Sequence, residues 1–320
     1  MKEKKSCCKK TSIGGQALIE GVMMRGPHKT AMANRMPDGT VDLEYVEVKS
    51  AKDKMKWLGW PFIRGVVNMV ESMILGYRTL MRSAEKAGIE EEEPGKFEQT
   101  LNKLFGDKLF HVLMAIAMVL GVGIALLLFM WLPVMVFNLI NKVPADLSPY
   151  KGLIEGVVKI IIFLGYVSLV SLMKDIRRVF QYHGAEHKTI FCYEAGEELT
   201  VENVRKQRRF HPRCGTSFLV LILVVSILLS SAVLAVFPVL KDITWLWVAI
   251  KILLLPVICA VGYELIKMCG RSDGIVSRIV AAPGLWVQRI TTKEPDDSMI
   301  EVAIASLQAV IPENAEDDRW

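Results

Sequence analysis

The chain has 320 residues, of which 52% are hydrophobic and 23% are charged, and its formal net charge is +5. A mean hydropathy of +0.34 is too apolar for an ordinary soluble domain, whereas the charged fraction is too large for a protein buried wholly in lipid. The composition therefore predicts membrane spans joined to water-exposed segments. The modest basic charge gives no reason to expect nucleic acid as a partner.

The first segment, residues 1–58, shows the alternation expected of a small sheet. Residues 41–45 (VDLEY) alternate apolar and acidic side chains, which is the pattern of a half-buried strand. Pro37-Asp38-Gly39, just before them, is a turn signature between two extended runs. We therefore expect a cytoplasmic β-meander over residues 15–50.

The second segment, residues 59–108, begins with a pattern typical of an amphipathic helix. Arg64, Glu71 and Arg78 recur every seven residues, so a helix over 61–83 carries one narrow polar stripe on a broad apolar surface. Two placements suit this surface, namely the membrane interface and packing against a partner domain. The acidic run EEEEPG at 90–95 is interpreted as a solvated linker.

Two helix pairs, residues 109–173 and 217–268, are predicted to cross the membrane. No Asp, Glu, Lys or Arg occurs between Lys108 and Lys142 or within 214–240, and each run exceeds the roughly 20 residues that a bilayer requires. The runs 153–173 and 243–266 are less clean because each contains two charged residues. The predicted fold class is an α-helical polytopic membrane protein, with four transmembrane helices, a small cytoplasmic β-meander and amphipathic helices.

Charged residues inside the predicted spans need partners, because isolated charges are costly in lipid. Glu155 and Lys159 are four residues apart in the second span, and Lys251 lies at comparable depth in the fourth. An intramembrane ion pair is the structural interpretation of these residues. A proton or substrate path is the functional alternative.

The segment between the two helix pairs, residues 174–216, sets the predicted orientation. Nine Lys or Arg residues lie within 174–213, against three in the presumed outer loops. By the positive-inside rule, this segment and both termini are cytoplasmic. The last segment, residues 269–320, is expected to form cytoplasmic helices, one of them capped by Asp296 or Asp297.

The same cytoplasmic segment contains HGAEH at 183–187, which has the inverted zincin pattern H-x-x-E-H. On a helix, His183 and His187 lie on one face, with Cβ atoms about 5–6 Å apart. That spacing suits two imidazoles that share one divalent metal ion, with zinc as the expected cofactor. Glu186 is then the candidate catalytic residue, acting as general base.

A third ligand is needed to complete such a site, and the candidates are Glu194, His211 and Cys214. Glu194 is too far along the helix to reach the two histidines unless the helix breaks near residues 194–196. Three of the five histidines and two of the six cysteines lie within 183–214, which favours metal binding. In the alternative interpretation, these groups hydrogen-bond to the basic loop or to lipid head groups. A closed ligand set would make the site structural, and an open position would make it catalytic.

Four longer motifs extend beyond this pattern. They are IGGQALIEGVMMRGP at 13–27, YHGAEHKTI at 182–190, HPRCGTSFL at 211–219 and PGLWVQRITTKEPDDSMIEVAIASL at 283–307. Through them the chain resembles the YqhQ family of bacterial membrane proteins, a family of unknown function often labelled as predicted metal-dependent enzymes. The resemblance implies a multi-pass protein of the bacterial cell membrane without a known substrate.

Two functional hypotheses follow. The first is a metal-dependent hydrolase at the cytoplasmic face of the membrane, acting on a peptide or a lipid-linked ester. The second is a non-enzymatic adaptor for membrane-protein assembly or quality control, in which a structural metal holds the loop. Its partners are the lipid bilayer and other membrane proteins. A transporter is less favoured, because four spans leave little room for a pathway.

Overall fold

The computed structural model describes residues 10–48, 50–88, 109–142, 147–271, 274–314 and 316–318. The chain divides into two compact units. The first is drawn from Met1–Gly88, Leu164–Ile222 and Pro256–Trp320, and the second from Ile89–Phe163 and Leu223–Leu255. The predicted acidic linker at 90–95 lies outside the described residues.

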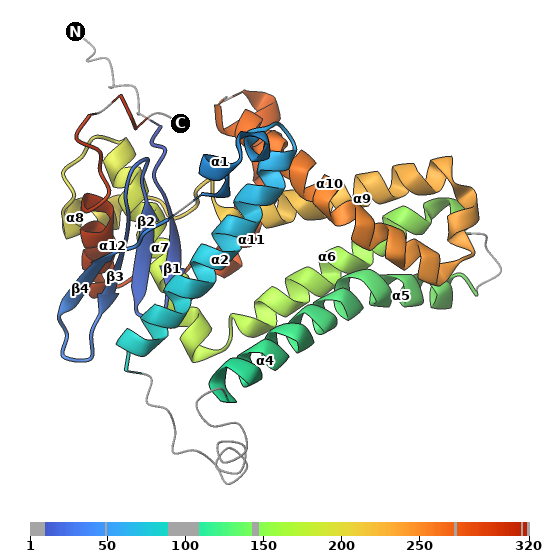
Figure 1. Cartoon of the computed structure of the whole chain (residues 1–320), viewed down its shortest axis with the longest axis horizontal. Coiled ribbons are helices and arrows are strands. Elements are labelled where there is room, and N and C mark those ends of the chain that lie inside the picture. Colours follow the sequence, from blue (N-terminus) through green and yellow to red (C-terminus); the bar gives the residue numbers. More distant parts are fainter. Residues whose placement is uncertain are drawn as a thin grey trace. The chain divides into compact units, whose positions relative to one another are not determined.

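A four-stranded antiparallel sheet lies in the first unit (Figure 1). Its strands follow one another in chain order and are β1 (Gly14–Leu18), β2 (Gly21–Arg25), β3 (Thr30–Arg35) and β4 (Val41–Tyr45). The predicted turn before residue 41 joins β3 to β4, and Gly39 adopts the left-handed conformation there with φ 84°. The predicted β-meander is therefore confirmed as a small antiparallel sheet.

The sheet has two buried faces, which is why its central strands do not show the simple alternation of a half-exposed sheet. On one face, Val22, Met24, Ala31 and Ala33 pack against helices α7 (Lys174–Glu194) and α12 (Asp297–Gln308). On the other face, a smaller cluster of Leu18, Met23, Met32 and Leu75 joins the sheet to α2 (Ile63–Lys86). The first cluster fixes α7 to the sheet, and α7 contains the H-x-x-E-H motif.

Helix α2 coincides with the predicted amphipathic helix. Two residues of its polar stripe have partners, because Arg64 pairs with Glu264 at 2.5 Å and Glu71 accepts a hydrogen bond from the Ala51 backbone N–H at 2.7 Å. The apolar surface remains exposed at Val70, Met73, Ile74, Tyr77 and Leu80. Protein atoms in the described part of the chain therefore cover only part of this helix.

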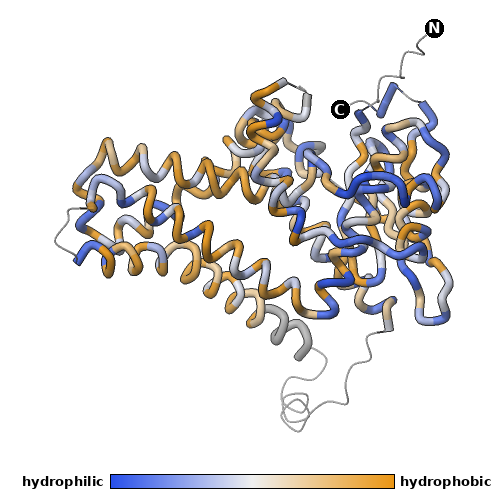
Figure 2. The backbone as a smooth tube through the Cα atoms, turned by 180° about the vertical axis from the view of Figure 1, so that it is seen from behind, coloured by the Kyte–Doolittle hydropathy of each residue, from blue (hydrophilic) through white to orange (hydrophobic). Residues whose placement is uncertain are grey.

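Four helices are long and apolar enough to cross a membrane, and they cover Ile116–Ile140, Ser148–Val170, Gly215–Val236 and Thr244–Gly270. The apolar residues of the chain concentrate along them (Figure 2). One side chain on each span shows how little protein covers it: Val119 is 71% exposed, Leu169 68%, Leu228 66% and Leu253 75%. The coarse prediction of four such helices beside a small sheet is confirmed.

The spans contain several elements. The first consists of α4 (Leu109–Leu126), a π-helical turn at Leu127–Trp131 and α5 (Leu132–Ile140), and the others are α6 (Lys151–Val170), α9 (Gly215–Val236) and α10 (Thr244–Arg271). The remaining helices are α1 (Ala51–Lys54), α8 (Val201–Lys206) and α11 (Ile275–Thr291), with short 3₁₀ turns at Lys56–Gly59, Ser148–Tyr150 and Pro238–Lys241.

The second unit encloses a cluster of charged side chains. Glu155 and Lys251 form an ion pair in which both side chains are 2% exposed. The Trp247 indole N–H donates to both carboxylate oxygens of Glu155 at 3.2 Å. Lys159 is buried within electrostatic reach of the same carboxylate, and Lys151 donates to the Lys241 carbonyl. The structure thus places the three residues considered for an intramembrane pair in one interior cluster.

Candidate metal centre

Helix α7 places the two histidines of the H-x-x-E-H motif on one buried face. It ends at Glu194, and Gly196 after it has a positive φ of 70°, so the chain turns at the point where Glu194 would need a helix break to reach the histidines. Gly184 permits close packing here, because a Cβ at this position would lie 2.0 Å from the Lys293 carbonyl oxygen. The segment that follows α11 can therefore approach the helix directly beside His183.

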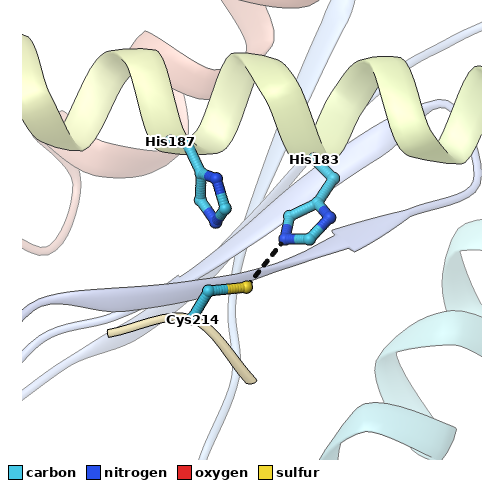
Figure 3. A group of neighbouring side chains, drawn as sticks. All are labelled: His183, His187 and Cys214. Carbon is cyan, nitrogen blue, oxygen red and sulfur yellow. Dashed lines mark hydrogen bonds between the residues drawn. The ribbon is translucent and has the colours of Figure 1, made fainter. Parts of the chain in front are cut away.

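His183, His187 and Cys214 meet at one point (Figure 3). Each offers a ligand atom, and these three atoms lie within 4.8 Å of one another. The His183 Nε2 atom is 3.1 Å from the Cys214 sulfur, and the two imidazole centroids are 4.4 Å apart. Tetrahedral zinc bonds of the usual lengths require ligand atoms about 3.3–3.8 Å apart, so only small adjustments separate this group from a zinc ligand set.

Backbone carbonyls orient both imidazoles. His183 Nδ1 lies 2.9 Å from the Thr291 carbonyl oxygen, and His187 Nδ1 lies 2.6 Å from that of Arg209. A carbonyl only accepts, so each Nδ1 must carry a hydrogen, and only Nε2 of each ring is left to bind a metal. This arrangement is the one that fixes histidine ligands around metals.

The Nε2 atom of His187 is buried and has no hydrogen-bond partner. Leaving such an atom unsatisfied costs roughly 1–3 kcal/mol, and native structures rarely do so. A metal ion at the common point would occupy this lone pair. This buried, unpaired nitrogen is therefore the observation that supports a metal ion bound by the three residues.

The surroundings of the Cys214 sulfur favour the ionised form that a metal requires. Burial opposes its ionisation, but the positive charge of His183 and His187 outweighs burial and lowers the pKa of the thiol well below its usual value. Thr216 adds a hydroxyl at 3.2 Å and a backbone N–H at 3.4 Å from the sulfur. Burial also opposes protonation of His183, yet the neighbouring sulfur raises the pKa of this histidine. A metal ion would replace the proton between them.

Glu186 lies beside this group without belonging to it. Its side chain is 4% exposed, and its Oε2 atom has no hydrogen-bond partner. Burial raises the pKa of the carboxyl, although the two histidines and the Gly15 backbone N–H act in the opposite direction. A Cβ on Gly15 would lie 2.9 Å from the Glu186 carboxyl carbon, so β1 approaches the carboxylate closely. A buried carboxyl with a raised pKa is suited to general acid–base work.

The structure places the other two candidate ligands in a neighbouring cluster. Glu194 is paired with Arg213 and accepts a hydrogen bond from the Thr11 N–H at 2.9 Å. Burial opposes ionisation of Glu194, but His211 and Arg213 outweigh it and lower the pKa of this carboxyl. Burial likewise lowers the pKa of His211 to about 4.

His211 is oriented away from a ligand role. Its Nδ1 accepts from the Arg213 backbone N–H at 3.3 Å, so its Nε2 carries the hydrogen, and that nitrogen faces a Glu194 oxygen at 3.7 Å. The His211 and His187 ring centroids are 5.5 Å apart. Among the described residues, only His183, His187 and Cys214 form a group of three or more potential ligands.

Four groups that contact His183, His187, Cys214 or the neighbouring Glu186 were not predicted from the sequence. They are Gly15, the carbonyls of Arg209 and Thr291, and Thr216. Thr216 had a detectable signal, since a hydroxyl two residues after a candidate cysteine ligand can reach its sulfur. The two carbonyls had none, because any residue provides one.

The comparisons place the chain among proteins of unknown function. Residues 60–313 match the model of a family described as "Protein of unknown function (DUF1385)". Over 301 residues the chain is 35% identical to the "Uncharacterized protein YqhQ" of Bacillus subtilis (strain 168), with 94% of this chain and 92% of that protein covered. No solved structure matches the chain.

Proposed function

We propose that this chain, which belongs to the YqhQ family of proteins of unknown function (DUF1385), is a metal-dependent hydrolase of the bacterial cell membrane. His183, His187 and Cys214 hold the metal, for which zinc is the cation best suited to two imidazoles and a thiolate. The substrate is a peptide or a lipid-linked ester that reaches the membrane surface.

The observation that carries this proposal is a three-ligand group with a buried carboxyl that is not a ligand. A structural zinc site has four protein ligands, whereas a catalytic one has three and an open position. Among the described residues the group has three members, and Glu186 lies beside it with one oxygen unpaired. The fourth position therefore remains for water and substrate.

The protein residues would divide the work of hydrolysis in a simple way. A bound zinc ion supplies Lewis acidity at neutral pH. Glu186 takes the proton from the attacking water and passes it to the leaving group, for which a raised pKa is an advantage. The Arg209 and Thr291 carbonyls keep both imidazoles in the tautomer that ligation requires.

The proposal is tested with Glu186→Gln, which keeps the shape of the side chain but removes the base. Purified variant and wild type are incubated with bacterial membranes, and released products that have gained one water are identified by mass spectrometry. The variant should keep its zinc and lose product formation by about 10²–10⁴-fold. His183→Ala should lose both. Equal product formation by wild type and Glu186→Gln would exclude this mechanism.

A second proposal is the non-enzymatic adaptor with a structural metal. The exposed apolar side chains of α2 favour it, because they form a surface that the described part of the chain leaves uncovered. Helix α12 adds little to such a surface, since its apolar side chains pack on the sheet. An adaptor should tolerate Glu186→Gln, so the same variant separates the two proposals.

Membrane insertion and orientation are part of the proposal. Four apolar helices with largely uncovered side chains support four spans, and the basic segment after the second span supports cytoplasmic termini. Reporter fusions after residues 145 and 241 should be active outside the cell, and fusions after 200 and 320 inside. A cytoplasmic signal at 145 would contradict the four-span arrangement and the location of the metal centre.

A further inference from the structure

A cavity of about 600 Å³ adjoins the candidate metal centre in the first unit. His211 lines this cavity and its ring lies beside that of His187, whereas none of His183, His187 and Cys214 lines it. The cavity is thus a separate space that shares one wall with the metal centre. Its volume lies within the range of small-molecule binding sites, about 300–1,000 Å³.

The lining of the cavity is strongly cationic. Lys10, Arg208, Arg213 and Arg278 line it, and Glu194 is the one carboxylate among the lining residues. Arg213 and Glu194 balance each other as an ion pair, and Arg208 and Arg278 add positive charge to the lining. Arg208 lies over the Phe191 ring with its Cζ 4.5 Å from the centroid. An anion is the complementary ligand, and guanidinium groups match the geometry of a phosphate.

The lining also contains apolar side chains from three helices. Leu221 comes from α9, Ile266 from α10 and Leu285 from α11, so two of the four apolar helices provide part of the wall. On α11, Ile275 is 76% exposed and Ile279 66% exposed. An apolar surface continues along this helix beyond the cavity. A ligand that fills this space needs an anionic head next to an apolar chain.

We propose that this cavity binds the phosphate head group of an anionic membrane lipid, with the acyl chains along α9, α10 and α11. The inference depends on the proposed membrane location of α9 and α10, but it does not require the metal. It also indicates a substrate class for the proposed hydrolase, because a lipid held here lies against His211, next to the metal centre.

The test measures binding of single lipids to the full-length protein in neutral detergent, by native mass spectrometry. Dioleoylphosphatidylglycerol should bind at one site, and zwitterionic dioleoylphosphatidylcholine should bind far more weakly. Replacing two lining cations, in Arg208→Gln with Arg278→Gln, should weaken phosphatidylglycerol binding by on the order of tenfold or more. The matched control, Lys206→Gln with Arg289→Gln, removes the same charge from exposed positions outside the cavity and should bind as wild type.

Two further variants make the result specific. Ala281→Trp fills the cavity from α11 without changing the charge and should also abolish binding. His183→Ala removes a proposed metal ligand and should leave lipid binding unchanged, so failure of the metal proposal and failure of this one are distinguishable. If the Arg208→Gln/Arg278→Gln variant and the Lys206→Gln/Arg289→Gln variant lost phosphatidylglycerol binding equally, the proposal would be overturned in favour of diffuse electrostatic attraction to the protein surface. Binding of inorganic phosphate to the same cations without any binding of phosphatidylglycerol would overturn it in favour of a free phosphate compound.

Discussion

Purified wild-type protein should contain about one zinc ion per chain, and His187→Ala should contain none above background. The Nε2 atom of His187 is buried without a hydrogen-bond partner, so we expect it to bind an ion at the point shared with His183 and Cys214. Removing one of three ligands should weaken zinc binding by more than the roughly 10–100-fold that loss of a supporting hydrogen bond costs. Elemental analysis of protein in detergent measures the content.

The matched control for this experiment is His28→Ala. His28 is 63% exposed and pairs with Asp317, away from the trio, so its loss should leave zinc content unchanged. Cys214→Ser gives a second, spectroscopic measurement. Cobalt-loaded wild type should show a sulfur-to-metal charge-transfer band that Cys214→Ser lacks. Zinc retained at wild-type affinity by both His187→Ala and Cys214→Ser would contradict the proposed ligand set.

Single substitutions in the buried Glu155–Lys251 pair should destabilise the protein by about 3–5 kcal/mol, because each leaves an uncompensated charge in an interior site. Glu155→Leu should be the more damaging, since it leaves Lys159 and Lys251 facing each other and deprives the Trp247 N–H of its acceptor. The double substitution to Leu should recover most of the loss. The free energy of unfolding in mixed micelles measures all three variants.

The Arg64–Glu264 pair is the control, because it has similar geometry but 26% exposure of both side chains. Its removal should cost no more than about 1 kcal/mol, as for other solvent-accessible pairs. Additive losses in Glu155→Leu with Lys251→Leu would show that the two charges do not stabilise each other. A cost at Arg64 equal to that at Glu155 would show that burial does not govern these pairs.

Local patterns in the sequence predicted most of the elements. The four long helices followed from runs of apolar residues, and the sheet followed from alternation and a turn signature near Gly39. Each of these patterns lies within a short stretch of sequence, and in each the residues themselves favour the structure that they form, whether an apolar helix or a strand. The helical spacing of His183 and His187 was predictable for the same reason, since four residues always return to one face.

Choosing the third ligand required information that the sequence did not contain. Cys214, His211 and Glu194 were equivalent candidates by residue type. The structure separates them by orientation: the His211 Nε2 atom faces Glu194, whereas the Cys214 sulfur faces His183. Such directions depend on how α7, α9 and the segment after Arg209 pack together. No short window of sequence specifies that packing, and a carbonyl such as that of Thr291 has no residue-type signal.

Assembly of the candidate metal centre requires segments of the chain that are synthesised at widely separated times. The Thr291 carbonyl that orients His183 is made 108 residues after it. Asp318 accepts hydrogen bonds from Thr11 and Tyr193, which links segments near both ends of the described chain to the end of α7. A nascent chain with both histidines exposed therefore lacks the groups that set their tautomers, so premature capture of the wrong metal is disfavoured.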